Sequence, residues 1–281
     1  MRDLFDASFN DVNNKVVSNI IDKARPTCYP DDLITTVRKV VRETGARVIP
    51  VIGKGDEKLL GVIRRGDILM VSSTKTNAIV SSIMSNPVVI INGNSKVSDA
   101  LKLLLKYDEW NAPVVNENNK YISLLTLGDI IKLLVSNHVD FLKSGKVEEC
   151  MSKDPISVNE EDYLSSIWKK MTRLKYAGFP VTNEKGVLTG IITQFDLLKK
   201  GYARIHLESE SGVSKGPKVK DVMSYTVKYL YPWSSMYEAA KIILERGYGR
   251  IPIVFSENNK RLVGIIDRED VAKLIIGDRN G

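Results

Sequence analysis

The sequence of 281 residues has only two cysteines and two histidines, and it has no long apolar run. Cys28 and Cys150 lie in unrelated contexts without CxxC spacing, so we expect reduced thiols that pack as small apolar groups. His138 and His206 each lack a second nearby ligand, which argues against a zinc site and against a Ser-His-Asp triad. No segment approaches the roughly 18 to 20 apolar residues that cross a bilayer, and the N-terminus lacks a signal-peptide layout. We therefore expect a cytoplasmic protein without a metal site and without a membrane partner.

Signatures of catalysis are scarce as well. The chain shows neither a nucleophile paired with a base nor a Gly-rich phosphate loop. Four aspartates that recur at similar positions in the chain are far apart in the sequence, and this spacing is unfavourable for two carboxylates that act as an acid–base pair. An enzyme is therefore the least favoured class, and we expect a binding protein that has no obligatory cofactor.

A moderate excess of positive charge marks the composition. The net charge is +7 at pH 7 and the isoelectric point is near 9.2, which would suit a polyanionic partner. Lysine and arginine nevertheless alternate with acids along the predicted helices, as on a solvated face, and no Arg-rich tract is present. Nucleic acid is therefore retained only as the alternative partner.

What the chain does contain is one pattern that occurs four times. A proline inside an apolar strand is followed about 17 residues later by an aspartate, and the whole pattern returns about every 60 to 70 residues. Such a recurrence is the signature of a repeat architecture. The prolines are Pro50, Pro113, Pro180 and Pro252, and the aspartates are Asp67, Asp129, Asp196 and Asp270.

Each copy contains the same elements in the same order. A short strand follows a Met-Ser pair, or Pro26-Thr27-Cys28 in the first copy, and an amphipathic helix comes next. The Pro-led strand, a polar turn and an apolar triplet then form a hairpin, and the aspartate lies in the first turn of a closing helix. The unit is β-α-β-β-α and the fold class is α+β. We place the copies at residues 15–75, 79–136, 146–200 and 218–277, with a polar linker at 201–217 and the main boundary near residue 145.

Period-3.6 stripes define the predicted helix faces. They are Leu33, Val37, Val40 and Val41 in the first copy, Val97, Ala100, Leu101 and Leu104 in the second, Leu164, Ile167, Met171 and Leu174 in the third, and Met236, Ala239, Ala240 and Ile243 in the fourth. These stripes are expected to form plain core.

Four copies of a helix, a Pro-led strand, a polar hairpin and a G-h-h-[ST]-x-x-D helix start resemble CBS domains, the module first described in cystathionine β-synthase. The clearest copy runs from Gly190 to Asp196, and the resemblance spans residues 15–277. It implies that two copies pack through their sheets into a Bateman pair and that two pairs form a flat disk, similar to the γ subunit of AMP-activated protein kinase. Proteins of this family bind adenosine-containing ligands in clefts between paired copies, and the ligands regulate an attached or partner protein.

The aspartate of each motif has two explanations. A threonine followed three residues later by an acid forms a capping box, as Thr193 and Asp196 would. The first copy has Arg64 in place of the threonine but keeps its aspartate, which suggests a role beyond capping. An aspartate can also accept both ribose hydroxyls, and a helix start can hold a phosphate. The resemblance implies ribose contacts at Asp67, Asp129, Asp196 and Asp270, and phosphate contacts at Thr126 and Thr193.

Differences between the copies change the expected ligand. In the fourth copy Asp267 would point a negative charge at a phosphate. We therefore expect that cleft to be empty or to take a ligand with an uncharged tail, such as an adenosine thioether. In the first copy Arg64 either clamps a phosphate or fills the cleft. Ser123 replaces the motif glycine in the second copy, and the consensus clefts are those of the second and third copies.

Two further arginines are candidates for a phosphate. The stretch G-R-I-P around Arg250 resembles the His-Arg-h-Pro stretch of the kinase γ subunit, and this resemblance places Arg250 opposite the ligand of the third copy. Gly249 stands where that motif has a histidine, so only half of the motif matches. Arg47, one position earlier in the first copy, is the candidate for the ligand of the second copy. An exposed turn residue is the alternative for both arginines.

These patterns predict a regulatory protein that binds AMP, ADP or ATP between paired copies and modulates a partner protein. AMP is the ligand that we favour, and both a monomer and a homodimer remain open. One alternative is a nucleic-acid-binding CBS protein that uses its basic surface. Another is a docking disk whose ligand sites are vestigial.

Overall fold

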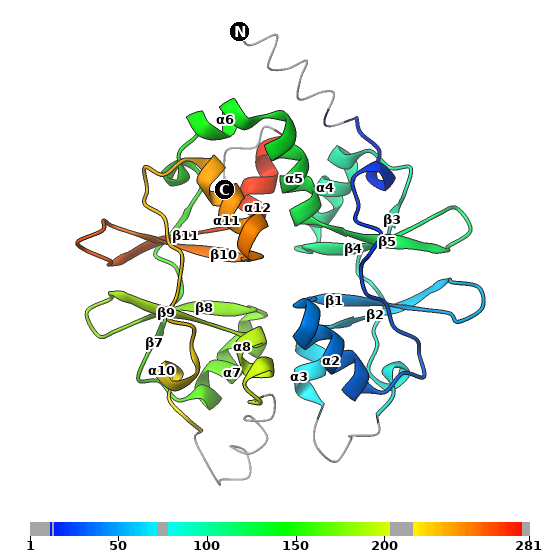
Figure 1. Ribbon diagram of the computed structural model, residues 1–281, viewed down its shortest axis with the longest axis horizontal. Coiled ribbons are helices and arrows are strands. Elements are labelled where there is room, and N and C mark those ends of the chain that lie inside the picture. The colour runs from blue at the N-terminus through cyan, green and yellow to red at the C-terminus, as the bar shows by residue number, and fades with distance from the viewer. Residues whose placement is uncertain (1–11, 13, 72–77, 203–215, 277–281) are drawn as a thin grey trace.

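The computed structural model describes residues 12, 14–71, 78–202 and 216–276, and four β-α-β-β-α copies account for most of them (Figure 1). The predicted α+β class is confirmed. Residues 203–215 of the expected linker, with His206, residues 72–75 of the first range and residue 277 of the fourth lie outside the described residues. The first copy opens at Cys28, which bridges in parallel to Val51, and continues with α2 (Ile34–Thr44), β1 (Val48–Ile52), β2 (Leu59–Arg64) and α3 (Arg65–Met70).

The other three copies repeat this order. The second has β3 (Ile91–Asn92), α4 (Val97–Lys106), β4 (Asn111–Val115), β5 (Tyr121–Thr126) and α5 (Leu127–Asn137). The third has β7 (Val158–Asn159), α7 (Leu164–Leu174), β8 (Gly178–Thr182), β9 (Leu188–Thr193) and α8 (Gln194–Lys199). The fourth opens at Leu230, which bridges to Ile253, and has α11 (Met236–Arg246), β10 (Arg250–Val254), β11 (Leu262–Asp267) and α12 (Arg268–Lys273). The remaining elements are η1 (Val17–Asn19) before the first copy, η5 (Leu274–Ile276) after α12, and, between the copies, η3 (Val80–Ser82), α6 (Val139–Ser144), η4 (Val147–Glu149), β6 (Ser152–Lys153) and α10 (Val219–Val222).

The recurring prolines occupy strand positions where the backbone C=O accepts a hydrogen bond and no backbone N–H is needed. Pro50 lies opposite Val62 in the hairpin, and its carbonyl oxygen accepts the N–H of Cys28 at 3.0 Å. The carbonyl oxygen of Pro252 accepts the N–H of Leu230 at 3.1 Å in the same way. Because proline has no N–H, it fits a strand only where the ladder asks for none.

The predicted helix stripes lie in the core, where Val40 and Leu174 are partly buried, with one residue as an exception. Val97 and Leu104 are 0% exposed, and the stripe of α11 is buried to the same degree. Leu33 was wrongly included, because it precedes α2 in an extended conformation and is 45% exposed. Ile34 is the first buried residue of that helix instead.

The sheets join the copies into two pairs. Val48 and Val62 of the first copy pack against Leu124 of the second. Val187 of the third copy forms a β-bridge with Arg261 of the fourth. In Figure 1 the first and second copies stack on the right and the third and fourth on the left, so the predicted Bateman pairs are confirmed.

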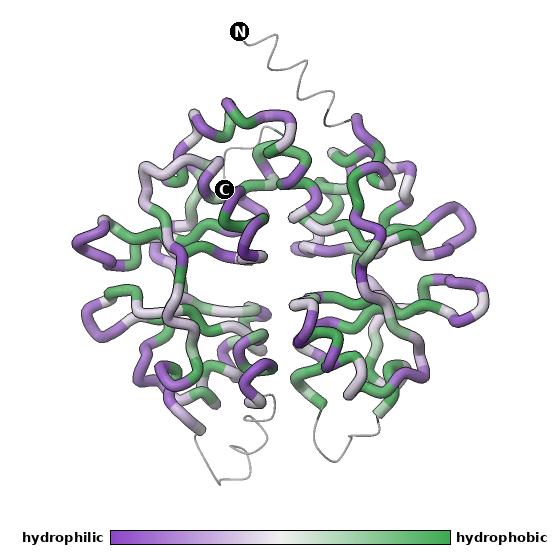
Figure 2. The backbone as a smooth tube through the Cα atoms, viewed as in Figure 1, coloured by the Kyte–Doolittle hydropathy of each residue, from purple (hydrophilic) through white to green (hydrophobic). Residues whose placement is uncertain are grey.

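The helices join the two pairs to each other. Helices α2 and α3 contact α8, and one hydrophobic core is shared by the first and third copies. Helix α5 contacts α11 and α12, and a second core is shared by the second and fourth copies. The four copies fill the quarters of a rounded outline, with the helices above and below the sheets (Figure 1). This arrangement of the two pairs is the predicted disk. Hydrophobic residues follow the strands, and hydrophilic residues cover the hairpin tips (Figure 2).

The segment that opens each copy packs on the sheet of its paired copy. Ser85, before the second copy, bridges to Val62 of the first. Ser224, before the fourth copy, bridges to Ile191 of the third. The two copies of a pair are therefore interlaced, and each cleft takes its second wall from the opening segment of the other copy.

The motif glycine makes room for this crossing segment. A Cβ atom on Gly190 would lie 2.9 Å from the backbone oxygen of Ser224, which is closer than carbon and oxygen pack. In the second copy Ser123 fits because its hydroxyl donates to the backbone oxygen of Asp22 at 2.5 Å. The replacement of glycine by Ser123 is thus compensated by a hydrogen bond.

Candidate functional site

Every motif aspartate uses one carboxylate oxygen to cap its own helix. Oδ2 of Asp67 accepts the N–H of Arg64 at 2.9 Å. This bond involves only the backbone of the first motif residue, so it forms whatever side chain stands there. Asp67 therefore caps its helix beside Arg64 as well, and its presence there does not by itself indicate a role beyond capping. The same bond measures 2.8 Å from Thr126 to Asp129, from Thr193 to Asp196 and from Asp267 to Asp270.

The other carboxylate oxygen, Oδ1, distinguishes the two consensus clefts. In the third copy the hydroxyl of Ser224 donates to Oδ1 of Asp196 at 2.8 Å. In the second copy Nη2 of Arg25 donates to Oδ1 of Asp129 at 2.6 Å. Both donors belong to the segment that opens the paired copy. Because a neutral hydroxyl can rotate to another acceptor, Asp196 is the better placed of the two to accept a sugar hydroxyl.

The threonines of the two consensus motifs adopt the same geometry. The hydroxyl of Thr126 donates to Asp129 at 2.9 Å and accepts the N–H of the same residue at 3.3 Å. The hydroxyl of Thr193 donates to Asp196 at 2.5 Å and accepts its N–H at 3.2 Å. Burial raises the pKa of Asp129, while the charge of Arg25 acts in the opposite direction.

The fourth copy carries the expected pair of acids. Oδ1 of Asp267 accepts the N–H of Glu269 at 2.8 Å and that of Asp270 at 3.3 Å. Burial and then the charge of Asp267 raise the pKa of Asp270 to about 7. Burial also raises the pKa of Asp267, opposed by Arg250, whose Nε lies 3.7 Å from its carboxylate. A ligand phosphate would therefore meet negative charge at this motif above neutral pH.

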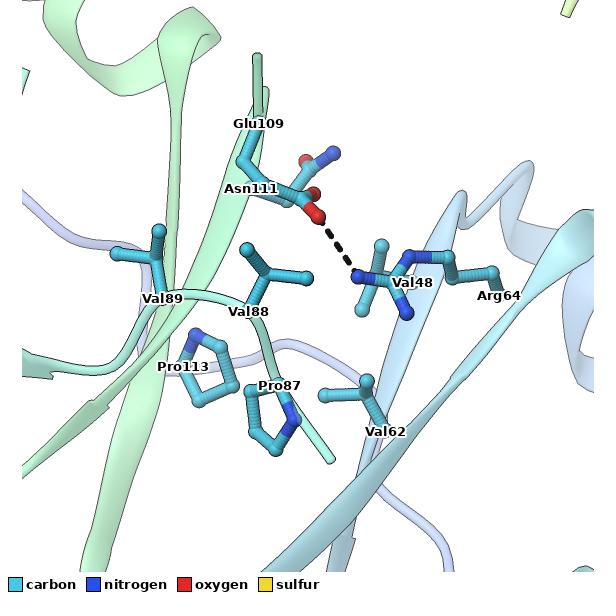
Figure 3. Close-up of a pocket in the computed structure, with 9 residues that line it drawn as sticks. All are labelled: Val48, Val62, Arg64, Pro87, Val88, Val89, Glu109, Asn111 and Pro113. Atoms are coloured by element: carbon cyan, nitrogen blue, oxygen red, sulfur yellow. Dashed lines mark hydrogen bonds and ion pairs between the residues drawn. The ribbon is translucent and has the colours of Figure 1, made fainter. Parts of the chain in front are cut away.

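The cleft of the first copy is closed by Arg64. Its Nη2 forms an ion pair with Glu109 at 2.7 Å (Figure 3). Its Nη1 donates to the hydroxyl of Ser85 at 3.1 Å. The remaining cavity, lined also by Pro87 and Val88, measures about 10 Å³, which is room for one water. Of the two roles left open for Arg64, this conformation shows the one in which it fills the cleft.

Four arginines form a cluster where elements of all four copies meet. Burial lowers the pKa of Arg47 well below its ordinary value, and repulsion from the other three arginines adds to this effect. Burial also lowers the pKa of Arg65 to about 10. Like charges held this close favour the binding of an anion between them. We define the arginine cluster as Arg47, Arg65, Arg250 and Arg268.

Aromatic rings hold two members of the arginine cluster in place. The guanidinium groups of Arg47 and Arg250 lie 5.2 and 5.3 Å from the ring centre of Trp110, within cation–π range. Arg250 also lies 4.4 Å from the ring centre of Tyr176. Arg250 thus contacts the third copy and Arg47 the second, which are the copies that the sequence assigned to them. Their contact with a ligand stays a prediction.

The glycine that replaces the motif histidine has a structural reason. A Cβ atom on Gly249 would overlap the guanidinium of Arg47. A side chain at this position would therefore displace Arg47 from the arginine cluster.

Sequence reasoning missed the other two members, Arg65 and Arg268. Each follows the first motif residue of its copy, and each donates through Nε to the backbone at the end of the preceding helix. The acceptors are the carbonyl oxygen of Ala46 at 3.2 Å and that of Tyr248 at 2.9 Å. These bonds fix the base of each guanidinium. The sequence signal is a basic residue at this position in the first and fourth copies only.

Each of these two arginines reaches the consensus motif of another copy. Arg65 lies 5.2 Å from the ring centre of Phe195, and the charge of Asp196 acts to raise its pKa against the effect of burial. Nη1 of Arg268 lies 3.5 Å from the position of a Cβ atom on Gly128, and Asp129 acts on its pKa in the same way. Each consensus Thr-x-x-Asp motif is therefore faced by an arginine from the neighbouring pair.

Other kinds of site find no support in the described parts of the chain. No group of three or more His, Cys, Asp and Glu side chains there could hold a metal ion. No helix in residues 12, 14–71, 78–202 and 216–276 has the length and apolar content to cross a membrane. Cys28 and Cys150 are both reduced thiols, and burial raises the pKa of Cys28 to about 12.

Comparison with known proteins identifies the repeat. The model of the CBS domain family matches residues 17–73, 80–136, 147–202 and 219–277. Protein MJ1225 of Methanocaldococcus jannaschii, which has been proposed as an archaeal homologue of g-AMPK, superposes with a TM-score of 0.80 at 25% identity, covering 92% of this chain and 99% of that one. An uncharacterised conserved protein from Pyrococcus horikoshii shares the fold, with a TM-score of 0.64 at 23% identity over 93% of this chain and 100% of that one. Protein MJ1404 of M. jannaschii is 26% identical over 276 residues, which are 95% of this chain and 63% of that protein. The chain therefore belongs to the CBS domain family.

Proposed function

We propose that this protein is a regulatory sensor that binds adenosine nucleotides, AMP above all, in clefts between paired copies and thereby modulates a partner protein. One observation carries the proposal. Each consensus Thr-x-x-Asp motif is faced by an arginine from another copy: the buried Arg65, over the ring of Phe195, at Asp196, and the half-buried Arg268, beside Gly128, at Asp129. An acceptor suited to sugar hydroxyls is thereby combined with a donor suited to a phosphate.

The third copy offers the best division of roles. Asp196 accepts the ribose hydroxyls once the hydroxyl of Ser224 rotates away. The hydroxyl of Thr193 then donates to the phosphate, and Arg65 and Arg250 neutralise its charge. A guanidinium pairs with a phosphate through parallel hydrogen bonds, and these bonds are strongest where water is largely excluded. ADP and ATP use the same contacts, with their further phosphates directed toward the rest of the arginine cluster.

The arrangement also suggests how a ligand could be sensed. Because Arg65 comes from the first copy and Asp196 from the third, a nucleotide bound to both would tie the two Bateman pairs together. A ligand that binds only this joined state raises its stability by RT ln(1 + [L]/Kd), where [L] is the free ligand concentration. A partner protein that contacts both pairs would respond to that change.

The fourth cleft has a different ligand preference. Asp267 and Asp270 present acids where the consensus copies present threonine and one acid. An adenosine compound with an uncharged tail, such as a thioether, fits this charge better than a nucleotide. Titration with 5′-methylthioadenosine at pH 8 tests this assignment, and loss of its binding in the Asp270→Ala protein is the expected result.

Nucleic acid binding is the second candidate, and the location of the charges argues against it. In the arginine cluster Arg65 is buried and the other three members are partly buried, whereas several surface lysines are paired with acids one helical turn away, as in Lys39 with Glu43 and Lys241 with Glu245. Partly buried arginines suit a small anion better than a duplex, which binds to exposed surface charge. A gel shift with tight binding that weakens steeply with salt would favour nucleic acid instead.

Calorimetric titration of the Asp196→Ala protein with AMP tests the proposal. We expect micromolar affinity in the wild type and the loss of one site in the variant. Asp221→Ala is the matched control, because Asp221 caps helix α10 by accepting the N–H of Lys218 at 3.1 Å and lies in no motif. If Asp196→Ala binds AMP as the wild type does, the assignment of the cleft is wrong. If no adenosine compound binds the wild type, the proposed function itself fails.

A further inference from the structure

Arg25 occupies the cleft of the second copy. It lies in the segment that crosses from the N-terminal region to the first copy, 104 residues away from its partner Asp129 in the sequence. Its Nη2 donates to Oδ1 at 2.6 Å, and the two side chains are 21% and 9% exposed. With Oδ2 engaged by the backbone and the hydroxyl of Thr126, both oxygens of the carboxylate have donors. The group that would hold a ribose is therefore already satisfied by the protein itself.

The other copies show that this arginine is specific to one cleft. The crossing segments align at Asp22, Ser85, Ser152 and Ser224, and Arg25 lies three residues after the first of these. The equivalent residues in the other segments are Val88, Pro155 and Val227. At the first cleft Val88 lines the cavity beside Arg64 (Figure 3). An apolar wall has thus been replaced by a cation in the second cleft alone.

The ion pair is of a kind that a ligand has difficulty displacing. Asp129 is 8% exposed, so water is a poor substitute for Arg25 as its partner. A ribose hydroxyl is a neutral donor, and hydrogen bonds between neutral and charged groups are weaker than those between opposite charges. A nucleotide that enters this cleft must first break the contact and leave Arg25 to find another partner.

We propose that Arg25 is an intramolecular competitor that determines which cleft the ligand occupies, excluding adenosine nucleotides from the second cleft while the third stays accessible. This inference rests on the proposed function, since it assigns different occupancies to two clefts that carry the same Thr-x-x-Asp motif. It also links ligand entry in the second cleft to release of the crossing segment around Arg25.

Arg25→Val tests the inference because it installs the residue found at the first and third clefts. We expect AMP titration of this full-length variant to show one more site than the wild type, or an affinity in the second cleft higher by about tenfold or more. The gained binding should disappear in the double variant Arg25→Val/Asp129→Ala. Lys23→Val removes the same charge from an exposed position in the same segment and should bind as the wild type does. If the valine variant folds poorly, Arg25→Gln replaces it in the titration, because glutamine removes the charge but keeps a donor to Asp129.

The outcomes separate this inference from the proposed function. Equal stoichiometry and affinity in the wild type and in both Arg25 variants would overturn the competitor role while leaving the third cleft assigned. Weaker binding in the Arg25 variants would also overturn it, because Arg25 would then be a ligand contact. Absence of AMP binding in both clefts of every variant would overturn the inference and the proposed function together.

Discussion

Replacement of Asp270 by asparagine is expected to stabilise the protein at pH 8. Burial and the neighbouring charge of Asp267 raise the pKa of Asp270 from 3.8 to about 7, so the folded state holds its proton more tightly than the unfolded state does. For such a group the stabilisation is complete below pH 4 and is lost as the pH rises toward 7. Asparagine removes the charge, and its side-chain oxygen can still accept the N–H of Asp267.

The size of the effect follows from the pKa values. Each pKa unit corresponds to about 1.4 kcal/mol, so the rise from 3.8 to about 7 sets an upper bound on the order of 4 kcal/mol for the change in the free energy of unfolding. Asp267 is 20% exposed and Arg250 partly compensates its charge, which reduces the expected gain to roughly 1 to 3 kcal/mol. At about 2 to 4 °C per kcal/mol, the Tm at pH 8 should rise by several degrees.

Thermal unfolding monitored by circular dichroism between pH 4 and pH 8 measures this difference. The gain of Asp270→Asn over the wild type should be near zero at pH 4, grow through pH 6 and level off above pH 7. Asp196→Asn is the control, since its helix begins at a threonine and no acid pair is relieved. A lower Tm of Asp270→Asn at pH 8, or an equal gain in both variants, would show that the charge of Asp270 does not destabilise the folded protein.

Three further changes probe the site. Thr193→Ala should lower stability by about 1 kcal/mol and weaken AMP binding, because Asp196 loses its hydroxyl partner, and Thr193→Ser should restore both in melts and titrations. Gly249→His should displace Arg47 and lower stability by roughly 1 to 3 kcal/mol, and an unchanged Tm would contradict the packing described for Gly249. Glu109→Gln should alter stability by about 1 kcal/mol or less, because its ion pair is partly exposed, and should raise the AMP affinity of the first cleft in calorimetry. An unchanged titration would show that this ion pair does not close the cleft.

The fold could be predicted because its information is local and repeated. The Pro-led strand, the polar turn and the helical stripe each depend on neighbours within about 20 residues, and four copies reinforce one another. Even the pairing of sheets follows, since each copy has an apolar sheet face that must be covered. The error at Leu33 arose at a helix boundary, where the 3.6-residue period does not yet apply.

The contacts that complete the site could not be predicted in the same way. Arg65 approaches Asp196, and Arg268 approaches Asp129, only because the helices of one pair pack on those of the other. The ion pair of Arg25 likewise joins residues 104 positions apart. None of these pairs shares a local pattern, so their proximity is a property of the assembled disk.

The capping bond shows a different limit. A sequence pattern records side chains, whereas the bond from the backbone of Arg64 to Asp67 needs none at the first position. Capping alone can therefore explain why every copy has an aspartate at this position. The evidence for ligand binding comes from the second carboxylate oxygen and from the arginine cluster. That distinction required the three-dimensional arrangement.

A crystal structure of the protein with bound AMP tests the central claim most directly. We expect the nucleotide between the third and fourth copies, with its ribose hydroxyls within hydrogen-bond distance of Asp196 and its phosphate against Thr193 and Arg65. A complex in which AMP binds elsewhere, while Asp196 keeps its contact with Ser224, would contradict this claim.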